Sequence, residues 1–194
     1  MESKITFESE GVTLKGMINR ASEQKAVVIC HPHPIFGGNM DNPVVRAIAR
    51  AFFNKGFTTL RFNFRLFCNG RDEQADVLAA LNCLEEMGFE GRYLSGYSFG
   101  AMVNATVVSK GCLVQDHVMV SPPVYLMNFD EIERIPNTGL IVTGDWDLFA
   151  PERVIRRHIE RWGGEPLFTI LTGCDHFYSG RLGNLQDTIE AYLA

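Results

Sequence analysis

The chain has 194 residues, of which 46% are hydrophobic and 21% are charged, and its formal net charge is −5. This length suits one domain with a sizeable core, and we expect a single domain over residues 1–194. The negative charge disfavours nucleic acid and anionic membrane surfaces as partners. The N-terminus lacks a signal-peptide pattern, and no apolar run is long enough to span a bilayer, so no membrane association is expected.

The cysteines indicate a reducing environment. They are five in number, scattered along the chain and without C-x-x-C spacing. An odd, scattered set argues against a disulfide framework and against a zinc site. We therefore expect a cytoplasmic protein that needs no metal.

Short strand-like segments alternate with longer helix-like segments along the chain. The predicted strands are 5–8, 14–18, 26–30, 58–62, 91–95, 118–120, 140–143 and 167–171. The predicted helices are 43–55, 75–87, 101–108, 151–162 and 185–194. The first two strands flank Glu10-Gly11, which indicates a hairpin. The strand–helix units that follow predict an α/β fold with a mostly parallel sheet and helices on both faces.

Local signals add detail to three of these elements. The continuous apolar run 26–30 is typical of a strand buried on both faces. The residues Asp41-Asn42-Pro43 predict the cap and first turn of a helix that Gly56 closes. In the helix over 75–87, the spacing points four apolar side chains inward: Val77, Leu78, Leu81 and Leu84.

The segment Gly96-Tyr97-Ser98-Phe99-Gly100 matches G-x-S-x-G, the nucleophile elbow. A predicted strand precedes it and a predicted helix follows it, which is the context that the motif requires. The glycines allow the two backbones to approach where a Cβ would clash. The alternative reading is a turn whose serine only makes hydrogen bonds. As a nucleophile, Ser98 would be served by the N–H of Phe99, at the start of the helix, as an oxyanion donor.

A serine nucleophile needs a base and an acid, which in this motif's fold class follow it in the order acid, then histidine. They are expected at the carboxyl ends of strands. Asp145 and Asp147 both follow the strand over 140–143, and His176 follows the last strand. Taken singly, each also fits a polar turn or loop. His117 and His158 lie before a strand and within a helix, and we expect surface or packing roles for both.

The loop after the third strand reads His31-Pro32-His33-Pro34-Ile35-Phe36-Gly37-Gly38. It is the expected source of a second oxyanion N–H. Proline has no N–H to offer, which leaves His33 as the first choice and Ile35 as the second. The alternative reading is that its histidines stiffen the loop through local hydrogen bonds. The H-P-H pattern lacks a nearby third ligand, so no metal site is expected there.

Five segments carry a resemblance to a known family: 31–42, 60–65, 96–100, 144–151 and 175–177. They are similar to the small, lidless, dienelactone-hydrolase-like bacterial α/β-hydrolases, and the H-P-H-P-x-x-G-G segment is the most specific match. The resemblance covers nearly the whole chain. It implies an α/β-hydrolase fold of about eight strands without a lid domain. It also implies Ser98 as nucleophile, Asp147 as acid and His176 as base.

Two arguments favour Asp147 over Asp145 as the acid. Asp145 directly follows Gly144, where a carboxylate commonly accepts N–H bonds within its own turn. Asp147 lies farther from the strand and can extend toward the loop that carries His176. The resemblance also places the acid three residues after the glycine.

The chain departs from its relatives after Arg65. Relatives usually continue with a longer loop rich in glycine, serine and acidic residues, whereas this chain has Leu66-Phe67-Cys68-Asn69-Gly70 and enters the next helix. Because this loop borders the predicted site, the relatives' substrate preference does not carry over. Arg65 and Arg71 could recognise a carboxylate, but a structural salt bridge is the favoured reading.

Aromatic side chains gather in the loops of the predicted site. Those expected to line a shallow apolar pocket are Phe36, Phe67, Tyr125, Trp146, Phe149 and Phe177. The alternative is that they pack the loops onto the sheet. The expected activity is hydrolysis of a small ester or thioester through an acyl-serine, without a cofactor. The alternatives are a peptidase or acyltransferase on the same residues, or a binding protein that has the fold without the activity.

Overall fold

The computed structural model describes residues 2–65 and 70–194. The strands in these ranges are β1 (Glu2–Ser9), β2 (Val12–Asn19), β3 (Lys25–Cys30), β4 (Thr58–Phe62), β5 (Gly91–Tyr97), β6 (Asp116–Val120), β7 (Thr138–Gly144) and β8 (Leu167–Leu171). The helices are α1 (Pro43–Asn54), α2 (Asp72–Glu86), α3 (Phe99–Ser109), α4 (Glu152–Trp162) and α5 (Leu182–Tyr192), and a short 3-10 helix, η1 (Pro34–Phe36), follows β3.

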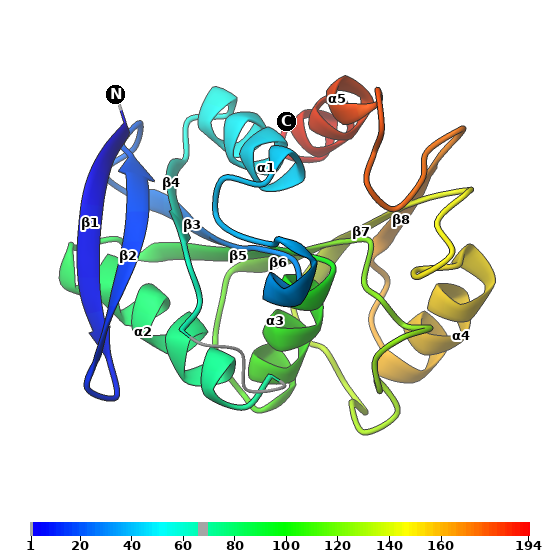
Figure 1. Cartoon of the computed structure of the whole chain (residues 1–194), viewed down its shortest axis with the longest axis horizontal. Helices are drawn as coiled ribbons and strands as arrows, with labels where there is room; N and C mark the ends of the chain where they lie inside the picture. Colours follow the sequence, from blue (N-terminus) through cyan, green and yellow to red (C-terminus); the bar gives the residue numbers. More distant parts are fainter. Residues whose placement is uncertain (1, 66–69) are drawn as a thin grey trace.

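The strands of this described part form one eight-stranded sheet in the order β1-β2-β4-β3-β5-β6-β7-β8. β2 pairs antiparallel with both β1 and β4, and every other neighbouring pair is parallel. Figure 1 shows α1 and α5 on one face of the sheet and α2, α3 and α4 on the other. The carboxyl ends of β3, β5, β7 and β8 therefore meet at one edge, where the predicted site residues follow them.

β3 shows why the sheet needs helices on both faces. Val27 and Ile29 pack in the core beneath α1 and α5, whereas Val28 and Cys30 pack in the opposite core against α2 and α3. All four side chains are fully buried. A strand covered on both faces has no polar face to offer, so it appears in the sequence as a continuous apolar run.

Three helices begin earlier than predicted, and one inward residue is wrong. α2 begins at Asp72 and α5 at Leu182, each three residues before the predicted start, and α3 begins at Phe99, two residues before it. Val77, Leu81 and Leu84 are buried as predicted, but Leu78 is 42% exposed. Residues 77, 81 and 84 share one helix face, and at 100° per residue position 78 falls at its margin.

The arginine that precedes the undescribed residues is structural. The Arg65 guanidinium bonds Asp76 of α2, with Nη2 2.6 Å from Oδ1, and it also donates to Ser9 at the end of β1. This agrees with the salt-bridge reading. Arg71 lies exposed just before α2.

Two buried histidines make the fold sensitive to acid. His31 directly follows β3. His117 lies within β6, not before it as predicted, and it is buried, which agrees with the packing role that was one of its two expected roles. Burial lowers the pKa of His31 from 6.5 to about 4 and that of His117 to about 3. Such a group stabilises the fold fully above its unfolded pKa. That contribution falls as the pH drops from about 6.5 toward those folded values.

We expect His117→Asn to flatten the dependence of unfolding free energy on pH between pH 7 and pH 5. Each histidine contributes about 1.4 kcal/mol per pH unit below 6.5, so losing one removes about 2 kcal/mol of the change. Urea unfolding at the two pH values measures it. Thr138→Val is the control, because it removes the hydroxyl 3.1 Å from His117 Nδ1 but leaves the titrating ring. An unchanged slope in His117→Asn contradicts the assignment.

Candidate active site

The G-x-S-x-G segment forms a sharp turn between β5 and α3. Ser98 connects the two elements with φ 55° and ψ −118°, a conformation rare for a residue with a side chain. The Ser98 N–H donates to the Val120 carbonyl of β6 at 2.9 Å, which anchors the turn to the sheet. The serine side chain therefore stands out from the carboxyl edge of the sheet.

Backbone contacts explain the two glycines of this turn. A Cβ on Gly96 would lie 2.5 Å from the Gly100 carbonyl carbon, and a Cβ on Gly100 would lie 2.4 Å from the Cys30 carbonyl oxygen. Real Cβ atoms do not approach backbone this closely. The close approach predicted from the motif is present.

Gly100→Ala is expected to destabilise the protein by about 3 kcal/mol, because the added methyl group meets rigid strand backbone. Gly183→Ala is the matched control in the first turn of α5, where an added Cβ meets nothing within 4 Å. That change should be neutral or stabilise by about 0.5 kcal/mol. Urea unfolding of both variants tests the difference, and equal stabilities would contradict the steric argument.

Ser98, His176 and Asp147 lie together, although they come from three separate loops. His176 Nε2 is 2.9 Å from Ser98 Oγ, and its Nδ1 is 2.9 Å from both carboxylate oxygens of Asp147. Their exposed fractions are 8% for Ser98, 7% for His176 and 3% for Asp147. The histidine thus bridges a hydroxyl and a carboxylate in a largely dry environment, the arrangement in which it can remove the serine proton.

The surroundings of Asp147 keep its carboxyl group ionised. Burial raises its pKa, but hydrogen bonds from His176, Ser121 and the Ala150 N–H outweigh burial, and the net pKa is lowered. A carboxylate that remains charged beside Nδ1 holds the imidazole in one tautomer and stabilises it when it is protonated.

Asp145 has a structural role that differs in detail from the predicted one. Its Oδ1 accepts N–H bonds from Gly173 at 2.7 Å and from Cys174 at 3.3 Å. These donors belong to the loop after β8, not to the turn of Asp145 itself. Asp145 therefore ties together the two loops that carry Asp147 and His176.

The candidate oxyanion N–H donors come from the start of α3 and from the loop after β3. Phe99 is the first residue of α3, where the helix dipole favours an anion. The Ile35 N–H donates to His33 Nδ1 at 3.1 Å, which disfavours Ile35 as the second oxyanion donor. His33 stays the first choice, and its ring packs edge-on against the Phe99 ring at 5.1 Å.

The histidines of this loop make the predicted local bonds, and His31 also makes a long-range one. His31 Nδ1 lies 2.6 Å from the Pro32 carbonyl oxygen, and its Nε2 accepts the Phe64 N–H at 3.1 Å. These bonds use both ring nitrogens of His31. The described residues contain no group of three or more histidine, cysteine, aspartate or glutamate side chains arranged to hold a metal.

The predicted aromatic residues that the structure describes form a largely exposed rim. Phe149 and Phe177 pack against the His176 ring at 4.9 and 5.5 Å between centroids. Phe36 packs against His33 at 5.4 Å. Those with most of their side chain exposed are Phe36 (82%), Tyr125 (72%), Trp146 (67%) and Phe177 (61%). Phe67, also predicted here, lies outside the described residues.

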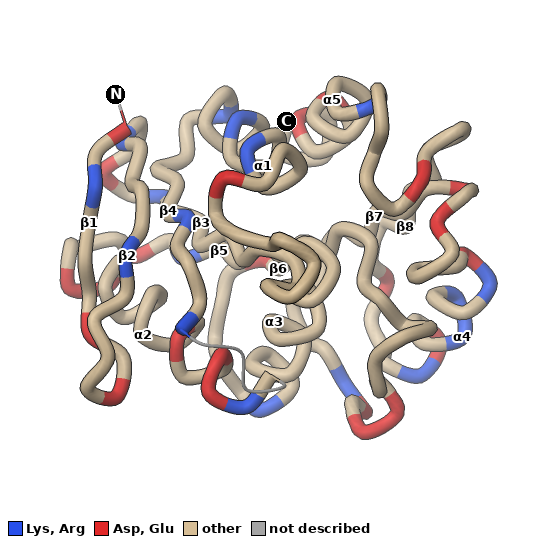
Figure 2. Tube along the Cα trace, viewed as in Figure 1, with Lys and Arg blue, Asp and Glu red and all other residues tan. Residues whose placement is uncertain are grey.

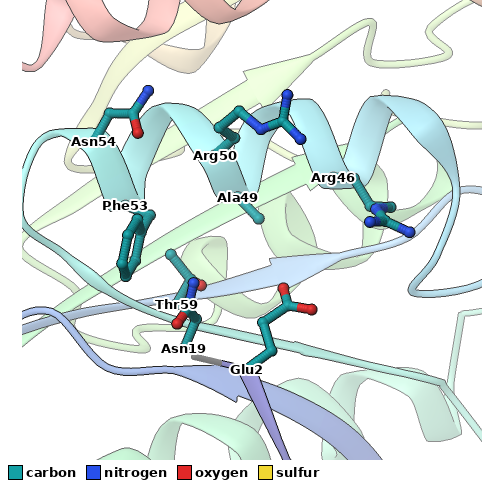
Figure 3. A pocket seen from close by; sticks show the side chains of 8 residues that line it. All are labelled: Glu2, Asn19, Arg46, Ala49, Arg50, Phe53, Asn54 and Thr59. Atoms are coloured by element: carbon teal, nitrogen blue, oxygen red, sulfur yellow. The ribbon is translucent and has the colours of Figure 1, made fainter.

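Two cavities in the described structure lie away from Ser98. One, of about 330 Å³, lies between α1 and the strands β1, β2 and β4, and its polar and charged lining includes Arg46, Arg50 and Asn19 (Figure 3). Another, of about 540 Å³, lies between β1 and α2. Neither of these two cavities is lined by Ser98, His176 or Asp147.

Several hydroxyl groups near these three residues were not predicted. The Tyr97 hydroxyl donates to the His176 carbonyl at 2.9 Å, and Ser121 and Tyr178 lie beside each other behind Asp147. Ser121 directly follows β6, so the strand-end rule could have found it. No local pattern distinguishes Tyr178.

Comparison with known proteins decides the family. No protein-family model matches the sequence. The chain superposes on an α/β serine hydrolase homologue from Coxiella burnetii with a TM-score of 0.90 and 30% identity, over 99% of this chain and 97% of that one. The chain belongs to the α/β serine hydrolases.

Two further proteins are similar to this chain over nearly its whole length. A lidless α/β serine hydrolase from Xanthomonas campestris has a TM-score of 0.90 at 24% identity, over 99% of this chain and 93% of that one. An uncharacterised protein of Rickettsia prowazekii is 27% identical over 209 residues, 98% of this chain and 88% of that one.

The predicted fold class is confirmed. Among its described residues, this serine hydrolase has an eight-stranded, mostly parallel sheet and no lid-like extra domain. Its connection from β6 to β7 contains no helix. No helix in the described ranges has the length and apolar character needed to cross a membrane.

Proposed function

We propose that this α/β serine hydrolase cleaves a small ester or thioester through an acyl-serine intermediate. Ser98 Oγ attacks the carbonyl carbon while His176 takes its proton, and Asp147 stabilises the resulting imidazolium. The Phe99 N–H and the His33 N–H hold the oxyanion. When the leaving group departs, His176 returns the proton to it, and water then releases the acyl group by the same route.

The observation that carries this proposal is the position of the His176 ring. Its two nitrogens lie 2.9 Å from Ser98 Oγ and 2.9 Å from the Asp147 carboxylate. These distances are within reach for proton transfer on one side and orientation on the other. The same arrangement also argues against the non-catalytic alternative, which has no need for a base held against a strained serine.

The surface around Ser98 favours an uncharged, partly apolar substrate. The loop over 31–40 and the segment 121–129 carry no lysine, arginine, aspartate or glutamate, and Figure 2 shows the first of these loops without charge colour. The exposed aromatic rim supplies apolar contacts for an acyl or alcohol group. Together with the motifs of the β3 loop, these features support an activity of the dienelactone-hydrolase-like, lidless kind.

A substrate panel tests the proposal against its alternatives. Turnover of p-nitrophenyl esters, acyl-CoA thioesters and aminoacyl anilides should be compared, with an alcohol acceptor added to detect acyl transfer. We expect hydrolysis of the esters or thioesters, with the anilides much slower. Preferred anilide cleavage indicates a peptidase, and acyl transfer in excess of hydrolysis indicates a transferase. No turnover of any of the three, with Ser98 unreactive, indicates a binding protein.

A further inference from the structure

The Asp147 carboxylate has a side-chain donor besides His176. Its Oδ1 accepts the N–H groups of Phe149 and Ala150 at 3.0 and 2.9 Å. Thr143 Oγ1 lies 3.5 Å from Oδ2, but a threonine hydroxyl has one proton, and this one points to the Ala150 carbonyl oxygen 2.7 Å away. Ser121 is a further hydrogen-bond partner that lowers the pKa of the Asp147 carboxyl group. An ionised carboxylate only accepts hydrogen bonds, so Ser121 is the donor of this pair.

The position of Tyr178 fixes the direction of these protons. Ser121 Oγ lies 2.8 Å from the Tyr178 hydroxyl, and both residues are fully buried. If the one proton of Ser121 goes to Asp147, the proton between Ser121 and Tyr178 must come from Tyr178. Burial raises the pKa of Tyr178, so its phenol keeps this proton. The donors are thus ordered from Tyr178 to Ser121 to Asp147.

Both hydroxyl residues have strained backbone. Ser121 has φ 46° and Tyr178 has φ 53°, in the left-handed region that side chains disfavour. In the described ranges, the other non-glycine residues of this kind are Ser98, Glu10 and Asn137. Glu10 lies in the hairpin turn and Asn137 in the turn before β7. The remaining three lie at the candidate site, where strain persists only because the surroundings hold it.

We propose that Ser121 and Tyr178 are positioning residues, whose ordered hydroxyls hold the Asp147 carboxylate with both oxygens toward His176. The inference rests on the proposed function, because this orientation matters only if His176 acts as a base. Without the two donors, the Phe149 and Ala150 N–H groups still hold Oδ1, but Oδ2 can turn away from Nδ1. The imidazole then spends less time aligned with Ser98, which slows the chemical step more than it weakens substrate binding.

Four variants separate this role from general stability. Tyr178→Phe keeps the ring but removes its hydroxyl, and Ser121→Gly removes the second hydroxyl while accepting φ 46° without strain. Tyr192→Phe is the tyrosine control, because it removes a 2.7 Å bond to Asp116 at the opposite end of β6. Ser109→Ala is the serine control, because its hydroxyl bonds only the turn of its own helix.

The measurements are kcat and KM for p-nitrophenyl butyrate, the rate of Ser98 labelling by a fluorophosphonate, and the proton NMR signal of His176 Nδ1–H. We expect Tyr178→Phe and Ser121→Gly to lower kcat and the labelling rate about ten-fold, with KM unchanged. The double variant should be no slower than Ser121→Gly, because both groups act through one chain of bonds. The NMR signal should shift or broaden in these variants and stay unchanged in the two controls.

The proposal is overturned if kcat and the NMR signal are unchanged in both hydroxyl variants. It is also overturned if the two losses add in the double variant or if the controls lose as much. Failure of the proposed function is a separate result, in which the wild-type protein does not label at Ser98. In that case the Nδ1–H signal still tests whether the two hydroxyls hold Asp147 in place.

Discussion

Ser98→Ala is expected to lower ester turnover by about 10⁶-fold and to abolish labelling by a fluorophosphonate probe. The reason is chemical: Ser98 Oγ is the only atom that the variant removes, and it lies 2.9 Å from His176 Nε2. The fold should survive, because alanine and serine have the same steric cost at φ 55°. Peptide mass spectrometry of the labelled wild-type protein locates the adduct, and thermal unfolding verifies the fold of the variant.

Ser179→Ala is the matched control for this experiment. Ser179 is exposed and lies three residues after His176, so a probe that reacts with any accessible serine near the site would label it. We expect labelling and turnover to be unaffected by its loss. An adduct on a serine other than Ser98, or labelling that persists in Ser98→Ala, would falsify the nucleophile assignment.

Asp147→Asn is expected to lower kcat by about 10⁴-fold at neutral pH, the scale seen when a triad acid becomes an amide. The amide carries no charge to stabilise a protonated His176, and its NH₂ group presents a donor where Nδ1–H needs an acceptor. The Phe149 and Ala150 N–H groups bond Oδ1, so the amide oxygen is held there and the NH₂ group takes the Oδ2 position, 2.9 Å from Nδ1. Rates with p-nitrophenyl butyrate measure the effect.

Asp145→Asn provides the comparison, because it changes the other carboxylate after β7. The amide oxygen can still accept the Gly173 N–H that Asp145 Oδ1 accepts at 2.7 Å. We expect a loss of less than about ten-fold in kcat, with the site geometry kept. If Asp145→Asn is the damaging change and Asp147→Asn remains active, the two assignments must be exchanged.

The choice between these two carboxylates shows where the sequence stopped being informative. Both follow the same strand, and aspartate after a glycine has many uses in turns. Position and family resemblance favoured Asp147, but the bonding of Asp145 was predicted in the wrong loop. Its partners, Gly173 and Cys174, lie 28 and 29 residues away along the chain. Such contacts depend on how two loops pack, and no local pattern records that.

The oxyanion loop and the aromatic residues show the same limit. Proline chemistry reduced the second N–H to His33 or Ile35, and a bond from the Ile35 N–H to the His33 ring then disfavoured Ile35. Aromatic composition located the rim, but not its exposure: Phe36 is 82% exposed. Whether an aromatic ring packs inward or stands in solvent depends on neighbouring loops.

The sequence by itself determined the order and type of the elements, the elbow at Ser98 and the histidine after the last strand. These follow from apolar periodicity, from glycine and proline, and from the rule that sites lie at the carboxyl ends of parallel strands. Only the tertiary structure decided the partners of Asp147 and the left-handed backbone of Ser121 and Tyr178. Ser121 and Tyr178 are 57 residues apart, and their hydroxyls meet only because β6 and the loop after β8 are brought together by the folded sheet.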